Sequence, residues 1–108
     1  MIINNQQSDE AGQHWIALYF DEKQSGIFFD SYGNSAKFYN LDNYIKKHSK
    51  SFIENTVQLQ SITSVYCGIY CVLFLIFMSN NYSLSEFIKL FKIRNQNEKM
   101  IEKFLKIF

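Results

Sequence analysis

The chain has 108 residues, of which 47% are hydrophobic and 18% are aromatic. This length corresponds to one domain, and so much apolar material argues against a disordered chain. The 11 lysines and arginines against 10 acidic residues leave a net charge of +1, which gives no general attraction to nucleic acid or acidic membranes. We therefore expect a single globular domain over residues 1–108.

The N-terminal part of the sequence predicts strands. Residues 2–3 fit a short edge strand, and residues 15–20 are apolar on both faces, as in a central covered strand. Residues 21–23 read as a turn, and residues 27–29 as a second strand that ends at Asp30. The first half of the chain is therefore expected to form a hairpin.

The second half predicts mainly helices. A helical spacing joins Leu41, Tyr44, Ile45, His48 and Phe52. Residues 57–60 fit a short strand, and Ser64 is the expected N-cap of a helix that reaches Met78 and is apolar nearly all round. Residues 83–86 form a capping box, and the last helix presents Met100, Ile101, Phe104, Leu105 and Phe108. A hairpin followed by helices predicts an α+β fold with a buried central helix.

The cysteines and the N-terminus indicate the compartment. Cys67 and Cys71 are too few for a disulfide scaffold, and their spacing in one helix does not favour a bridge. Residues 1–13 lack the basic and apolar regions of a signal peptide. The longest uncharged apolar run has 14 residues, against the roughly 20 that span a bilayer. We expect an intracellular protein of the nucleus or cytoplasm, or one carried in a virion, that is not secreted and does not bind membranes.

Four polar residues stand where one mechanism needs them: His14, Asp30, Gln60 and Cys67. Each alone has a common structural explanation, as a structural histidine, a turn-forming aspartate, a loop glutamine or a small buried cysteine. Together they match the parts of a cysteine protease site, namely a base, a residue that orients it, an oxyanion donor and a nucleophile.

His14 and Asp30 are predicted to meet across the hairpin. If residues 21–23 form the turn, Phe20 pairs with Gln24 and His14 pairs with Asp30 in the same register. Directly opposite residues share one face, with Cβ atoms about 4.5–5.5 Å apart, and an Asp–His hydrogen bond fits that separation. A longer turn or a bulge would change this register.

Cys67 is expected in the first helical turn, where unpaired N–H groups and the helix dipole favour a thiolate. Gly68 would allow a substrate backbone to approach closely. Gln60 lies seven residues before Cys67, so its amide could face the developing oxyanion beside the Cys67 backbone N–H. His14 would take the thiol proton and return it to the leaving amine, and Asp30 would hold the imidazole.

A resemblance rests on four motifs, which are GQHWIALYF at residues 12–20, FDSYG at 29–33, LQ at 59–60 and SVYCGIYC at 64–71. In this order they resemble the adenovirus endopeptidase (adenain) family, and more closely the adenain-type proteases of virus-like DNA transposons. They are similar, more distantly, to the SUMO-specific, Ulp-type proteases of the same clan. The resemblance extends over about residues 2–108.

The resemblance implies a papain-like, adenain-like α+β fold with a mixed central sheet and the nucleophile on a buried central helix. It implies a cysteine endopeptidase that cleaves viral or transposon capsid-type proteins, often after a small residue such as glycine. Trp15 would flank the substrate cleft, with a core position as the alternative. Asp30 stands where adenain has glutamate and follows the transposon and SUMO-protease pattern.

The resemblance also bears on cofactors and on chain length. Adenain is activated by DNA and by a disulfide-linked viral peptide; this chain has no further cysteine for such a peptide, so only DNA is kept as a candidate activator. Family members carry several dozen residues before the histidine strand, whereas 13 precede His14 here. We therefore expect the C-terminal catalytic portion of such a protease, without its usual N-terminal segment.

Three alternatives remain beside the capsid-type endopeptidase. The chain could be a non-catalytic or inactive remnant that binds proteins, or a protease of SUMO or ubiquitin-like proteins. A metal site of Cys67, Cys71, His14 and His48 is disfavoured, because two cysteines four residues apart in a helix do not have the usual zinc spacing. We predict no metal and no required cofactor.

Overall fold

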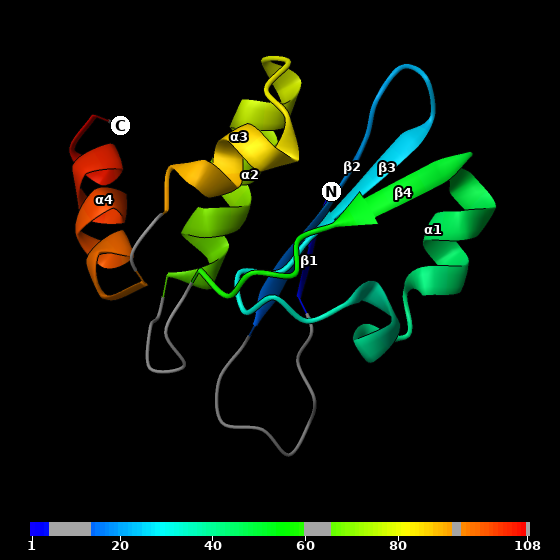
Figure 1. Cartoon of the computed structure of the whole chain (residues 1–108), viewed down its shortest axis with the longest axis horizontal. Helices are drawn as coiled ribbons and strands as arrows, with labels where there is room; N and C mark the ends of the chain where they lie inside the picture. The colour runs from blue at the N-terminus through cyan, green and yellow to red at the C-terminus, as the bar shows by residue number, and fades with distance from the viewer. Residues whose placement is uncertain (5–13, 60–65, 92–93, 108) are drawn as a thin grey trace.

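A computed structural model describes residues 1–4, 14–59, 66–91 and 94–107 of the chain. Its centre is a four-stranded sheet in the order β1-β2-β3-β4. Helix α1 covers one side of this sheet and helices α2 and α3 cover the other, with α4 outermost (Figure 1). The predicted α+β fold with a mixed sheet is confirmed.

The sheet combines antiparallel and parallel pairs. Its strands are β1 (Ile2–Asn4), β2 (Trp15–Phe20), β3 (Ser25–Phe29) and β4 (Ser51–Glu54). Pairs β1–β2 and β2–β3 are antiparallel, and β3–β4 is parallel. The predicted edge strand and the predicted central strand 15–20 are therefore confirmed.

The continuous apolar sequence of β2 follows from burial on both faces. Ala17 and Phe29 contribute to a core under α2, whereas Ile16, Leu18 and Phe28 contribute to a second core under α1. A strand with one wet face would alternate apolar and polar residues, and β2 does not need to do so because helices cover both of its faces.

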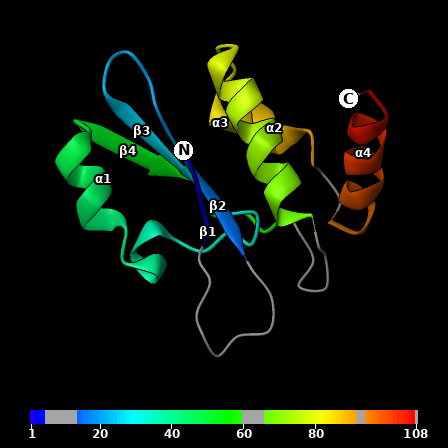
Figure 2. The same cartoon turned by 180° about the vertical axis from the view of Figure 1, so that it is seen from behind.

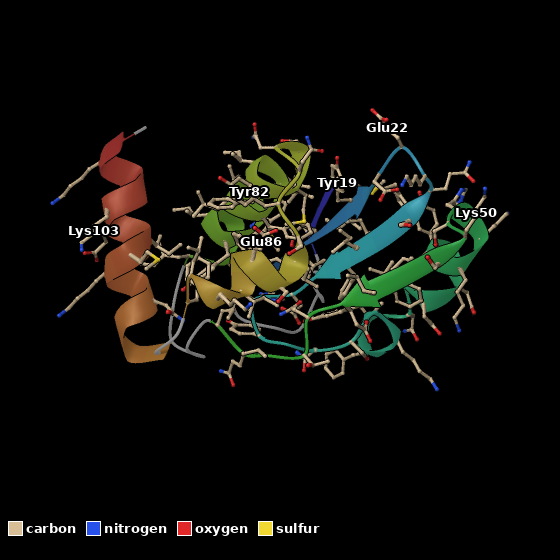
Figure 3. All side chains as sticks on the ribbon, turned by 45° about the horizontal axis from the view of Figure 1, so that its top comes forward. Tyr19, Glu22, Lys50, Tyr82, Glu86 and Lys103 are labelled. Carbon is tan, nitrogen blue, oxygen red and sulfur yellow. The ribbon has the colours of Figure 1, made fainter. Side chains whose placement is uncertain are left out.

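The β2–β3 turn has the predicted length of three residues but lies one residue further along the chain than predicted. The pair Phe20–Gly26 closes the ladder, and the Asp21 N–H donates to the Ser25 carbonyl over 3.0 Å. Three residues thus form the loop, and its last one, Gln24, has a φ of 64°, as in hairpin loops that combine a type I turn with a left-handed residue. Glu22 marks the tip of this loop (Figure 3). The predicted pairing of Phe20 with Gln24 is wrong, and the register shifts by two residues.

The crossover connection between the parallel strands β3 and β4 contains η1 (Ala36–Tyr39) and α1 (Asp42–His48). The predicted helical period is confirmed as far as His48, but Phe52 lies in β4. The backbone becomes extended at Ser49 and then pairs beside β3, with Ser51 opposite Ser25. Residues 57–59 form no strand. Pairing of residues 51–54 with β3, which is distant in sequence, therefore overrides the helical period that the local sequence shows.

The remaining helices are α2 (Cys67–Ser79), α3 (Leu84–Lys89) and α4 (Arg94–Ile107). The capping box of α3 is confirmed, with both reciprocal hydrogen bonds between Ser83 and Glu86. The N-cap of α2 is Tyr66, and the predicted cap Ser64 lies outside the described residues. In α4, Ile101 is buried as predicted, while the side chains of Phe104, Leu105 and Phe108 lie outside the described part.

Helix α2 is the central helix, but it is not buried all round. Its side toward β2 buries Tyr70, Cys71 and Phe74 completely, whereas Val72 is 46% and Ile76 37% exposed. The view from behind shows α2 lying between the sheet and α4 (Figure 2). Among the described residues, no helix has the length and apolar character needed to cross a membrane.

Candidate active site

His14 and Asp30 are in direct contact at the ends of neighbouring strands. His14 comes immediately before β2, Asp30 immediately after β3, and His14 Nε2 lies 2.6 Å from Asp30 Oδ1. They are not directly opposite, because the turn lies one residue further along the chain than predicted and this shifts the register by two residues. A shift of two keeps side chains on the same face, so the predicted contact is present although the predicted pairing is wrong.

The Asp30 carboxylate is fully buried and its hydrogen bonds are satisfied on both oxygens. Oδ1 accepts from His14 and from the Tyr32 backbone N–H at 2.9 Å. Oδ2 accepts from the Tyr39 hydroxyl at 2.6 Å and from the Asn34 N–H at 3.2 Å. The Tyr39 hydroxyl and the two backbone N–H groups are three donors independent of His14. They match an ionised carboxylate, which only accepts, and this assigns the proton of the fourth contact to His14 Nε2.

The backbone of Asp30 is fixed by Asn55, which follows β4 and is buried. Asn55 Oδ1 accepts from the Asp30 N–H at 3.0 Å, and Asn55 Nδ2 donates to the Asp30 carbonyl at 2.7 Å. The amide thus continues the sheet hydrogen bonding where the β3–β4 ladder ends. Sequence reasoning missed Asn55 and Tyr39, because nothing in the local pattern connects either of them to Asp30.

The His14 ring is held between Asp30 and an aromatic wall. Its ring stacks on Tyr32 with centroids 4.2 Å apart and planes 12° from parallel. Only 13% of the side chain is exposed. Nδ1 is buried and has no hydrogen-bond partner among the described residues. Among the described residues, Nδ1 is therefore the ring nitrogen of His14 without a hydrogen-bond partner.

Cys67 begins α2, as predicted, and is nearly buried. The next residue, Gly68, lies against Trp15, since a Cβ at Gly68 would be 3.5 Å from Trp15 Cδ1. Trp15 follows His14 directly, so the first turn of α2 is packed against the start of β2. Trp15 is half-buried and packs on the core under α2, which leaves both its predicted cleft role and the core alternative in place.

Cys71 lies one turn deeper in α2 and is fully buried. Burial raises the pKa of its thiol, and the nearby charges of Cys67 and Asp30 raise it further. Cys71 is therefore a neutral core residue, in agreement with the prediction that it faces the core.

Gln60 lies outside the described residues. Its neighbour Leu59 is buried and hydrogen-bonded at both backbone groups: its N–H donates to the Ser31 carbonyl at 2.8 Å, and its carbonyl accepts from Asn97 Nδ2 at 2.7 Å. Asn97 on α4 thus connects the C-terminal helix to the segment that precedes Gln60. Within the described ranges, no three His, Cys, Asp or Glu side chains are arranged to hold a metal ion.

A mixed sheet with helices on both faces, a His–Asp pair at its strand ends and a cysteine at the start of the central helix define a cysteine protease fold of the adenain and Ulp type. Residues 1–101 match the family model described as adenovirus endoprotease. The chain belongs to the adenovirus endoprotease family, and the predicted family is confirmed.

One relative agrees with this assignment in sequence, and one solved structure is similar to this chain in fold. A protein named protease from bovine adenovirus 7 is 34% identical over an alignment of 88 residues, and the match covers 68% of this chain and 44% of that protein. The crystal structure of an ASFV protease, in its selenomethionine form, is similar in fold with a TM-score of 0.70 and 20% identity, over 89% of this chain and 39% of that chain. The chain therefore spans less than half the length of either relative.

Proposed function

We propose that the chain is a cysteine endopeptidase that hydrolyses peptide bonds of viral or transposon capsid-type proteins after a small residue such as glycine. The nucleophile is Cys67, the base is His14 and the orienting residue is Asp30. Gln60 donates to the oxyanion, and Trp15 and Gly68 bound the substrate cleft. The His14–Asp30 hydrogen bond at 2.6 Å, which leaves Nδ1 unpartnered, is the observation that carries this proposal.

Acylation follows from these roles. The Cys67 sulfur attacks the scissile carbonyl carbon while the thiol proton passes to His14 Nδ1. Negative charge develops on the carbonyl oxygen, where the Gln60 amide and the Cys67 backbone N–H stabilise it. The tetrahedral intermediate collapses, the C–N bond breaks, and the proton on Nδ1 moves to the leaving amine. A thioester on Cys67 remains.

In deacylation, a water molecule is the nucleophile and the Cys67 sulfur is the leaving group. His14 Nδ1 takes a proton from a water molecule, whose oxygen attacks the thioester carbon. The C–S bond then breaks, the acid is released, and the proton on Nδ1 returns to the Cys67 sulfur. Asp30 stays ionised throughout and keeps the Nε2–H proton in place, which fixes Nδ1 as the nitrogen that exchanges protons. No metal takes part, and DNA is proposed only as an activator of the rate.

A Gly-terminated peptide vinyl sulfone tests the proposal on this chain. We expect a covalent adduct that peptide mapping places on Cys67 and that the Cys67→Ala variant does not form. A Gly-containing fluorogenic peptide should be hydrolysed by the parent and not by Cys67→Ala. Adding double-stranded DNA to the same assay measures activation.

Cys71→Ala is the matched control, because it removes the other cysteine from the same helix. It should keep the adduct on Cys67 and most of the hydrolysis. Equal hydrolysis by the parent and Cys67→Ala, or an adduct distributed over both cysteines, would rule out Cys67 as the nucleophile.

A further inference from the structure

Tyr39 contacts the Asp30 carboxylate on the oxygen that His14 does not use. The residue ends η1, and its hydroxyl donates to Asp30 Oδ2 at 2.6 Å, a distance equal to that of the His14 contact on Oδ1. Burial, and then the hydrogen bond to Asp30, raise the pKa of Tyr39. The hydroxyl therefore stays protonated and remains a donor across the working range of a peptidase.

The other contacts of Tyr39 hold its hydroxyl in this place. Its oxygen accepts from Asn34 Nδ2 at 3.4 Å. Its ring packs against Phe28 and Phe38, with centroid distances of 6.1 and 5.0 Å. The ring also faces the imidazole of His14, at 6.2 Å. The aromatic contacts hold the ring in place, and the ring in turn holds the hydroxyl against Asp30 Oδ2.

Among the described donors to this carboxylate, His14 and Tyr39 are the two side chains, and the other two are backbone N–H groups. A carboxylate can rotate about its Cβ–Cγ bond, and one strong donor on each oxygen fixes that rotation. The direction in which Oδ1 faces determines the position of the His14 ring, and through it the direction of Nδ1.

We propose that Tyr39 is a positioning residue of the proposed peptidase, whose hydroxyl holds the Asp30 carboxylate in the plane that directs His14 Nδ1 toward the nucleophile. This inference rests on the proposed function. A purely structural role would need the Tyr39 ring but not its hydroxyl, so Tyr39→Phe separates the two roles. Tyr44→Phe on α1 is the matched control, because Tyr44 is 42% exposed.

Kinetics give the first test. Tyr39→Phe should lower kcat by roughly 10- to 100-fold, as a misplaced catalytic group does, with KM unchanged because the substrate cleft is intact. Tyr44→Phe should change neither constant. A change in KM alone, or an unchanged kcat in folded Tyr39→Phe, would contradict the proposal.

Proton NMR of the imidazole gives a second test that needs no activity. The chain has two histidines, His14 and His48, so His48 serves as the internal reference in protein labelled with 15N-histidine. In Tyr39→Phe the Nε2–H resonance of His14 should move upfield, because its hydrogen bond to a less restrained Asp30 lengthens, while the His48 signals stay. An unmoved His14 resonance overturns the inference even if Cys67 proves to be the nucleophile. A moved resonance supports the link from Tyr39 to His14 even if the parent hydrolyses no peptide.

Discussion

At the scale of single residues, the Cys71 thiol should react much more slowly in the folded chain than in the unfolded chain. Burial is the largest cause that raises the pKa of Cys71, and it persists in the Cys67→Ala variant, so a smaller fraction of Cys71 is thiolate in the folded chain at any given pH. At about pH 8.5, where an ordinary cysteine is half ionised, iodoacetamide should label Cys71 in folded Cys67→Ala roughly 100-fold or more slowly than in urea. Mass spectrometry of the labelled peptide measures the two rates.

The same experiment has a clear contrary outcome. If Cys71 reacts in the folded variant as fast as it does in urea, the helix opens readily or Cys71 does not face the core. The unfolded chain is the control, since it contains the same cysteine without burial.

The sequence predicts some members of the site and not others, for a physical reason. His14 and Asp30 could be paired from the sequence because a hairpin brings its two strand ends together whatever the exact turn length, provided the shift is even. Asn55 and Tyr39 act on Asp30 through a crossover that returns the chain beside β3. No local period encodes that return, so their roles became visible only with the fold.

At the scale of elements, the capping box of α3 predicts a pH-dependent contribution to stability. Hydrogen bonds from the backbone and then the side chain of Ser83, with Lys89 adding a smaller effect, lower the pKa of Glu86. The unfolded chain, with a glutamate pKa of about 4.3, then binds more protons than the folded one in this range. The stabilisation is therefore complete above that value and is lost as the pH falls through the lower folded pKa.

Glu86→Gln isolates this charge, because glutamine at this position can still accept the bond from the Ser83 N–H. The urea midpoint of the parent should exceed that of Glu86→Gln at pH ~6, and the difference should shrink toward pH ~3, as the carboxylate protonates. Glu102→Gln, on the exposed side of α4, controls for the loss of one negative charge. A difference between parent and Glu86→Gln that is equal at both pH values would refute this explanation.

The elements also differ in how far the sequence predicts them. The capping box of α3 was predictable because its donors and acceptors are three residues apart. The β2–β3 turn was not, because its left-handed position is occupied by Gln24 and not by glycine or asparagine, which usually reveal such a position. Strand β4 was missed because it is defined by a parallel partner and not by its own four residues.

At the scale of the whole molecule, the sheet joins two cores of different character. The core under α2 contains Cys71 and the rings of Phe29, Tyr70, Phe74 and Phe87, while the core under α1 is smaller and mainly aliphatic. The candidate site is at one end of this sheet, because His14 precedes β2 and Asp30 follows β3, while Cys67 begins the helix on the larger core. On α4, Lys103 faces away from the sheet (Figure 3), so the helix outside the larger core presents charge to solvent.

The distance between α1 and the sheet is set by Gly26. A Cβ there would lie 3.2 Å from Ile45 Cγ2 on α1, 3.2 Å from Phe52 Cβ on β4 and 3.3 Å from Phe20 Cε1 on β2. Three elements would have to move together, and one of the atoms is a Cβ that cannot rotate away. Gly26→Ala should therefore lower the free energy of unfolding by about 1–3 kcal/mol, as overpacking does.

Gly68→Ala is the matched substitution under the other helix layer. Its Cβ would meet Trp15 Cδ1 at an ordinary 3.5 Å, and alanine is favoured over glycine in a helix by up to about 1 kcal/mol. The stability of this variant should be unchanged or increased. Urea unfolding followed by circular dichroism compares both variants with the parent. If Gly26→Ala proved as stable as Gly68→Ala, α1 would be able to move away from the sheet without a loss of stability, and Gly26 would not set the distance between them.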